Sequence, residues 1–245
     1  KEKPIVPDNL NWDLWLGPVK YRDYHSDYHP TKWRAWMDFG TGSMGDMGCH
    51  ILDPAFYALE LGAPTEIQAT STHWIPEISS QTYPLASIVR MKFPKRKNHP
   101  ELKLTWSDGR LLPPIPEEFG QNETFTPSGA LIIGDKGKIV HNSHGASGLK
   151  IIPEKKMNEF KIPEKKIKRV STNHHQDWIR ACKDGEPASS TFDYGGPLTE
   201  MALLGMIGIK LKDQLLKWDS KNLKFTNNEE ANNVIHKEYR KGWSL

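Results

Sequence analysis

The chain has 245 residues, of which 37% are hydrophobic and 10% aromatic, and its formal net charge is +3. This composition is too apolar for a disordered protein, and the length is enough for one large domain or two small ones with a buried core. The longest apolar run, Met201 to Ile209, is far shorter than the roughly 20 residues that cross a bilayer, so we expect no membrane partner.

The charge is concentrated in one segment. Residues 153–170 contain seven basic residues and three glutamates, and they therefore contribute +4 and leave −1 for the remainder. IPEKK occurs at Ile152 and again at Ile162, and a nucleic-acid-binding protein would more often show a basic face interleaved with aromatics. We interpret the segment as a solvated loop or edge hairpin, with polyanion binding as the minor alternative, and expect no nucleic-acid partner.

The cysteines and the first residues say little about the compartment. Cys49 and Cys182 have no CxxC partner and do not form a disulfide framework. Nothing at Lys1 resembles a secretory signal, but a leader could precede it, so both cytoplasm and periplasm stay open.

The first expected elements are a long aromatic segment and a helix. Residues 8–39 show neither a period of 3.6 nor an alternation of 2, and so long a loop in a compact domain is usually functional or wrapped onto another surface. Residues 44–61 are then predicted to form a helix, with Asp46 in its first turn, Gly62 as its C-terminal cap and Pro54 as a local bend.

Strand patterns follow in the middle of the chain. They cover residues 65–75, 85–93 and 101–106 (ELKLTW), and ALIIGDKGKIVHN predicts a hairpin that turns at 135–137, before a strand at GLKII. After the basic segment we predict a helix that is capped by Ser171, Thr172 or Asn173 and ends near Gly185. A buried helix from about 197 to 218 follows, and then a short strand and a final helix.

This order of elements predicts an α+β fold, an open, mainly antiparallel β-sheet with helices packed on one face. We expect residues 1–245 to form a single domain, in which residues 1–38 are an aromatic-rich lead-in segment. An open sheet face needs covering, so we expect a homo-oligomer that associates through it.

A G-x-G-x-x-G pattern at Gly40, Gly42 and Gly45 raises the question of dinucleotide binding. That fingerprint requires a hydrophobic strand before the first glycine and a βαβ unit around it. WRAWMDF is a poor buried strand, and no clear βαβ alternation follows. We therefore expect no cofactor-binding residue here.

Asp46, His50, Asp53 and Tyr57 fall on one stripe of the predicted helix. A carboxylate one turn from an imidazole can orient it and make it a better general base. A capping Asp46 with a structural His50 is the plainer interpretation. A metal would need a further ligand, such as His174 or His175, and we expect no metal site.

The motif GTGSMGDMGCHILD resembles that of the glucose–fructose oxidoreductase and inositol dehydrogenase (Gfo/Idh/MocA) family. Other stretches resemble one branch of that family in the same order: NWDLWLGP, YHPTKWRAWMDFG, HHQDWIRACKDGEPASSTFDYGGPLTEMALLG and WDSKNLKFTNNEEANNVIHKEYRKGW. The resemblance implies that this chain is the second, substrate-binding half, and that NAD or NADP is held by an N-terminal Rossmann domain it lacks. No cofactor is expected for this chain alone, which would be inactive by itself, and the family's catalytic lysine is not carried onto Lys3.

The resemblance also implies roles for particular residues. His50 and Asp46 would be catalytic, with His50 taking the proton of a sugar, glycoside or cyclitol hydroxyl. Expected substrate-binding residues are Trp33, Arg34, Trp36, Asp53, His174 and His175. The tryptophans could instead pack the loop onto the sheet, Asp53 could be structural, and the two histidines could lie on the surface.

Two other functions remain open at this point. One is an NAD-dependent glycoside hydrolase or lyase of the same superfamily. The other is a non-catalytic carbohydrate-binding or assembly module.

Overall fold

The computed structural model describes residues 3–72, 80–167, 169–170 and 173–244. The main sheet has five strands in the order β3-β2-β1-β7-β8, and every neighbouring pair is antiparallel. Its strands are β1 (Glu66–Ser71), β2 (Ser87–Phe93), β3 (Leu102–Ser107), β7 (Leu215–Asp219) and β8 (Lys224–Phe225). A second antiparallel sheet joins β4 (Gly129–Ile133), β5 (Lys138–Asn142) and β6 (Lys150–Ile152). The predicted α+β class is confirmed.

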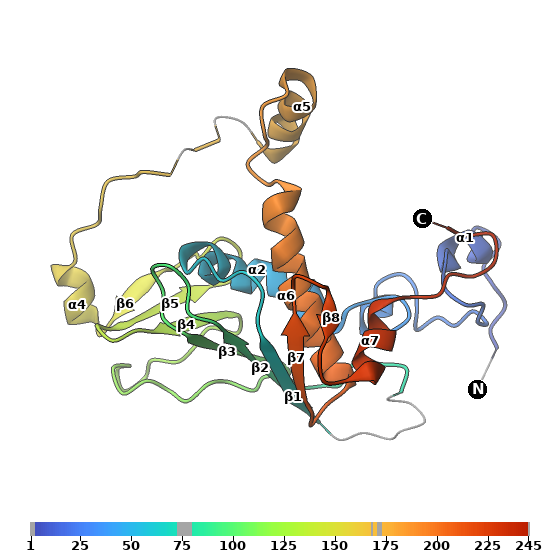
Figure 1. Cartoon of the computed structure of the whole chain (residues 1–245), viewed down its shortest axis with the longest axis horizontal. Helices are drawn as coiled ribbons and strands as arrows, with labels where there is room; N and C mark the ends of the chain where they lie inside the picture. The colour runs from blue at the N-terminus through green and yellow to red at the C-terminus, as the bar shows by residue number, and fades with distance from the viewer. Residues whose placement is uncertain (1–2, 73–79, 168, 171–172, 245) are drawn as a thin grey trace.

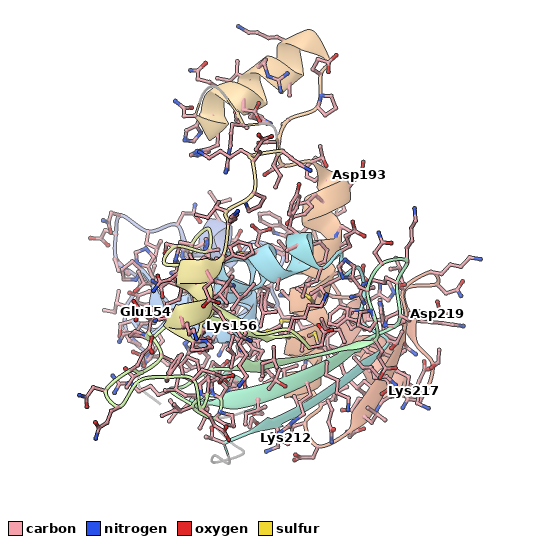
Figure 2. The ribbon with its side chains drawn as sticks, turned by 90° about the vertical axis from the view of Figure 1, so that its left-hand side faces the viewer. Glu154, Lys156, Asp193, Lys212, Lys217 and Asp219 are labelled. Atoms are coloured by element: carbon pink, nitrogen blue, oxygen red, sulfur yellow. The ribbon has the colours of Figure 1, made fainter. Side chains whose placement is uncertain are left out.

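Two long helices, α2 (Gly42–Ala58) and α6 (Phe192–Lys210), lie on one face of the main sheet (Figures 1 and 2). Each strand of that sheet alternates, so that Ile67, Val89 and Met91 are buried beneath the helices. The opposite face is polar and charged, with exposed Arg90, Lys103 and Lys217. The helices therefore cover one face only, as predicted.

Glycines let the two long helices approach each other and the sheet. Gly48 of α2 lies 3.6 Å from the methyl group of Ala202, measured from the position a β-carbon would take. On α6, the equivalent positions at Gly205 and Gly208 lie within 3.0 Å of Met44 and of Ile67, respectively. These short approaches allow α6, apolar nearly all round, to be buried in the centre of the core.

The predicted helix at 44–61 is present, but both of its ends differ. It begins at Gly42, because Gly42 adopts φ +61 and the Gly45 N–H donates to the carbonyl of Thr41 (3.2 Å). Asp46 therefore lies in the second turn, where the helix dipole gives it less stabilisation than in the first. The helix ends at Ala58, and the first left-handed residue after it is Glu60 (φ +47), not Gly62.

The predicted helix 197–218 is wrong at both ends. α6 starts five residues earlier and ends at Lys210, and residues 215–219 form β7. Leu216 and Trp218 are buried while Leu215 and Lys217 are exposed. This alternation is that of a strand and not of a helix, and the segment pairs with β1.

Several other predictions hold. β2, β3, the β4–β5 hairpin and β6 occupy the expected segments, and Leu102, Leu104 and Trp106 share the covered face of β3. The strand predicted for 65–75 is present as β1, while residues 73–75 lie outside the described residues. β8 and α7 (Glu229–Ile235) close the chain.

The helix α5 (His174–Asp184) projects from the body of the molecule, beyond the first turn of α6 that Asp193 marks in Figure 2. The side chain of Asn173 caps it by accepting from the Gln176 N–H (3.0 Å), and Gly185 ends it in the left-handed conformation, both as predicted. The other cap candidates, Ser171 and Thr172, lie outside the described residues.

The basic segment before α5 differs from the predicted loop or edge hairpin. Its first part forms the short helix α4 (Glu154–Glu159), which begins after Pro153 with Glu154 in its first turn, where the helix dipole favours a carboxylate. The described residues that follow, 160–167 and 169–170, are exposed and without regular structure. No helix in the described part of the chain is both long and apolar enough to cross a membrane.

Candidate functional site

The aromatic segment at residues 8–39 forms a small cluster of its own. It contains α1 (Trp12–Leu16), capped by Asn11, and a 3-10 turn, η1 (Lys32–Ala35). Trp12, Leu16 and Tyr28 are buried at its centre, and Trp15, Trp36 and Phe39 pack around them. Stacked and edge-on rings (Trp12–Trp15 centroids 4.7 Å, Trp15–Phe39 4.9 Å) fix these side chains in position.

Arg22 holds this aromatic cluster together from within. Its guanidinium lies 4.7 Å from the centre of the Tyr28 ring and 5.2 Å from that of Trp36. It also donates to the carboxylate of Asp38 (2.6 Å) and to the side-chain oxygen of Gln81 (2.7 Å). The segment is thus anchored to the loop that precedes β2.

The C-terminal tail, residues 236–244, binds the same cluster from outside (Figure 1). Arg240 donates to the carbonyl of Gly17 (2.9 Å) and pairs with the carboxylate of Asp13. Lys237 donates to the carbonyl of Asp38 (2.7 Å). Both chain ends therefore contribute to one surface.

Two shallow hollows flank η1 on this surface. The first, here the Arg34 hollow, has a volume of about 410 Å³ and is lined by Asp27, Thr31, Lys32, Arg34, Ala35, Trp36 and Thr82. The second, here the Trp33 hollow, has a volume of about 360 Å³ and is lined by Trp15, Leu16, Pro18, Val19, Trp33, Asp38, Phe39 and Lys237.

A tight glycine turn links η1 to α2. A β-carbon on Gly40 would lie 2.4 Å from the carbonyl oxygen of Arg34, and one on Gly42 would lie 2.5 Å from the ring of Tyr83. The Gly40 N–H donates to the carbonyl of Trp36 (2.8 Å). The space beside these glycines is filled by the protein itself, and the turn follows a 3-10 helix and not a parallel strand.

This turn brings Arg34 to the first polar residue of the helix stripe. Arg34 Nε lies 3.4 Å from a carboxylate oxygen of Asp46, and both side chains are about half exposed (47% and 43%). The guanidinium also lies 4.9 Å from the centre of the Trp33 ring. Arg34 lines the Arg34 hollow, and together with Asp46 it forms one polar patch.

His50 lies one turn further along α2 and is exposed. Its ring stacks on that of His144, with centroids 4.4 Å apart and planes at 21°. The His144 N–H donates to the carbonyl of His50 (3.0 Å), and the ring Nδ1 of His144 lies 2.9 Å from Ser143 Oγ. The structure has no hydrogen bond between His50 and Asp46, so the neighbour that positions the imidazole is His144.

No pattern in the sequence pointed to His144. It lies in the loop after β5, in the stretch NSHGASG, and adopts a left-handed backbone (φ +59). The pairing depends on how the second sheet packs against α2, more than 90 residues away in sequence. Only the Gly- and Ser-rich character of the loop could have marked it as a candidate.

Asp53 and the two remaining histidines lie elsewhere. Asp53 accepts a hydrogen bond from the hydroxyl of Tyr194, which joins α2 to α6. Burial and this hydrogen bond raise the pKa of Tyr194 well above its usual range. His174 and His175 stand at the start of the projecting α5, with ring centroids 4.0 Å apart, away from α2 (Figure 1).

Trp33 and Trp36 differ in their surroundings. Trp36 packs against the aromatic cluster and donates from its ring N–H to the carbonyl of Asp27 (3.1 Å). Trp33 is half-buried, but it belongs to neither of the two hydrophobic clusters. The structural interpretation of the tryptophans therefore fits Trp36 better than Trp33.

Within the described residues, no three His, Cys, Asp or Glu side chains are grouped so as to hold a metal ion.

Residues 1–75 match the family described as oxidoreductase family, C-terminal alpha/beta domain (GFO_IDH_MocA_C2). This range includes η1, the glycine turn and all of α2. A search of curated proteins found no significant match.

Proposed function

Because residues 1–75 match the family model of the C-terminal domain of Gfo/Idh/MocA oxidoreductases, we propose that this chain supplies the substrate-binding and acid–base groups of an NAD(P)-dependent oxidoreductase. Its substrate is a sugar, glycoside or cyclitol, which is oxidised at a hydroxyl group. The observation that supports this most is the surface formed by the Arg34–Asp46 pair, the exposed His50 one turn further on, and a hollow with an aromatic wall.

In this proposal His50 is the proton acceptor. An exposed imidazole can reach a substrate hydroxyl, and stacking on His144 fixes the plane of the ring before substrate binds. Asp46 and Arg34 bind the neighbouring hydroxyls, since one offers acceptors and the other donors. Trp36, which the aromatic cluster holds in place, also lines the Arg34 hollow, where its ring can contact the sugar.

The dinucleotide does not fit the glycine turn of this chain. Pyrophosphate binding needs open space beside the glycines at a strand-to-helix turn, and here that space is occupied by Arg34, Tyr83 and Thr41. We propose that the cofactor is held by a Rossmann domain outside these residues. The steps assigned to this chain therefore concern only the substrate hydroxyl.

The test is His50→Ala, in the protein expressed with any sequence that precedes Lys1 in its gene. Turnover of sugars and cyclitols with NAD or NADP should fall by about 100- to 10,000-fold, as is typical of an acid–base group. His99→Ala, in the loop between β2 and β3, is the matched control and should change turnover less than about twofold. Unchanged turnover in His50→Ala would exclude the assigned role, and glycoside cleavage without NADH release would favour the hydrolase or lyase.

A further inference from the structure

Resting on the proposed function, we propose that the two hollows beside η1 are two sugar subsites, and that the substrate is a pyranose glycoside of at least two rings. The ring to be oxidised occupies the Arg34 hollow, whose Arg34 pairs with Asp46, and His50 lies one helical turn beyond Asp46. The second ring stacks in the Trp33 hollow.

The size of the hollows supports one ring in each. Their volumes of about 410 and 360 Å³ lie near the lower limit of small-molecule pockets, which are about 300 to 1,000 Å³. Trp33 lines one hollow and Arg34 the other, and they are consecutive residues of η1, so this one 3-10 turn lies between the hollows. A molecule with two linked rings can therefore span η1.

The Trp33 hollow has the chemistry of a sugar platform. Rings of Trp15, Trp33 and Phe39 line it, and ring contacts with their neighbours hold Trp15 and Phe39 in place. Flat aromatic faces suit the apolar faces of pyranose rings, and side chains that are already fixed lose little entropy on binding. Trp33 packs in neither hydrophobic cluster, and the Arg34 guanidinium lies over its ring (4.9 Å), so the remaining exposed surface of Trp33 is available to a ligand.

Polar groups at the rim suit hydroxyls. The ammonium of Lys237 donates one of its three hydrogens to the carbonyl of Asp38 and can donate the others to a ligand. The carboxylate of Asp38 is held by Arg22 and retains free acceptor positions. An aromatic floor with a few polar groups at one edge favours a neutral carbohydrate over a purely apolar ligand.

The experiment measures sugar binding to the 245-residue chain by isothermal titration calorimetry. The probes are glucose, galactose, mannose and myo-inositol, beside maltose, cellobiose, lactose and trehalose. We expect at least one disaccharide to bind about tenfold more tightly than its component monosaccharides, a difference of about 1.4 kcal/mol. Trp33→Ala should abolish this advantage and leave monosaccharide binding within about twofold, while Trp33→Phe retains most of it.

Trp178→Ala is the control, because Trp178 is an exposed tryptophan (66%) on the distant α5. Equal affinities for monosaccharides and disaccharides, or a loss of both in Trp33→Ala at unchanged circular dichroism, would overturn the two-subsite proposal alone. If the folded wild-type chain binds none of the eight probes, the two-subsite proposal fails, whereas the proposed function is decided separately by the turnover of His50→Ala.

Discussion

Two tyrosine side chains contact α2 near the candidate site: Tyr83 from the loop before β2 and Tyr194 from α6. Both hydroxyls are held in their neutral form. Burial raises the pKa of Tyr83 well above its usual range. Burial also raises the pKa of Tyr194, and the hydrogen bond to Asp53 adds to this. Tyr83 lies against Gly42 at the turn, and Tyr194 lies against Asp53 on the helix stripe.

These raised pKa values predict a loss of stability at high pH. The unfolded chain releases tyrosine protons from about pH 10, while the folded chain retains them, so the free energy of unfolding falls as pH rises above that value. The stabilisation is fully present below about pH 10. Urea denaturation at about pH 8 and about pH 11 should show this fall, and the double variant Tyr83→Phe/Tyr194→Phe should show a smaller one. An identical fall in the double variant would contradict the assignment.

The Tyr194–Asp53 hydrogen bond makes a separate prediction. Tyr194→Phe leaves the half-buried carboxylate of Asp53 without this donor, and it should reduce the free energy of unfolding by about 1–3 kcal/mol. Tyr57→Phe is the matched control, because Tyr57 lies on α2, as Asp53 does, and is 54% exposed. If the two variants unfold at the same urea concentration, Asp53 does not depend on Tyr194 and is available for substrate.

At the scale of single residues, the sequence predicted candidate site residues but not the residues that contact them. The spacing of Asp46, His50 and Asp53 on one stripe followed from the helical period alone. The observed partners are Arg34, His144 and Tyr194, and each comes from a different element. A helical period relates residues within one helix, and it carries no information on what packs against that helix.

At the scale of elements, the close packing of α6 depends on glycines that differ in their surroundings. A β-carbon at Gly208 would lie 2.8 Å from a branched methyl of the fully buried Ile67. At Gly48 of α2 the nearest atom, on Ala202, is 3.6 Å away, which is ordinary contact. The two positions should respond to substitution in opposite directions.

Gly208→Leu should therefore destabilise the protein by about 1–3 kcal/mol, since a buried side chain has no room between α6 and β1. Gly48→Ala should be neutral or stabilising by up to about 1 kcal/mol, because alanine favours helix. Thermal melts of the two variants measure both effects. A lower melting temperature for Gly48→Ala than for Gly208→Leu would be inconsistent with this packing.

Most elements were predicted correctly from the sequence, but the boundary between α6 and β7 was not. Residues 201–209 and 215–218 are mainly apolar on either side of KLKDQ, and we predicted one helix through both stretches. The chain instead turns after Lys210, with Asp213 left-handed (φ +64), and Leu216 and Trp218 enter the sheet beside β1. Helical and strand burial leave similar short apolar patterns, and only the position of the neighbouring strand distinguishes them.

At the scale of the whole molecule, the chain runs out of the body and returns. After α4 it leaves the second sheet, passes through the exposed basic residues to α5, and comes back as α6 (Figure 1). Asp177 ties α5 to the returning chain by accepting from the backbone and hydroxyl of Ser189, and these bonds and Arg180 lower its pKa.

Asp177→Asn should loosen this connection without altering the body. A neutral amide replaces a carboxylate that accepts from Ser189 and Arg180, so α5 should exchange its amide hydrogens faster while α2 and α6 keep their protection. Hydrogen–deuterium exchange with mass spectrometry distinguishes these segments. Equal exchange of α5 in both proteins would show that the carboxylate is not needed there.

The excursion through α5 has a further consequence, that the chain should work as a split protein. The core takes Ile67 and Met91 from before the exposed segment and Met201 and Ile207 from after it, and β1 pairs with β7 across the same divide. A break between residues 163 and 164 cuts only exposed, irregular chain, whereas a break between residues 200 and 201 cuts the centre of α6. Residues 1–163 and 164–245, coexpressed with a tag on one piece, should copurify as one folded species, while pieces divided at 200 should not.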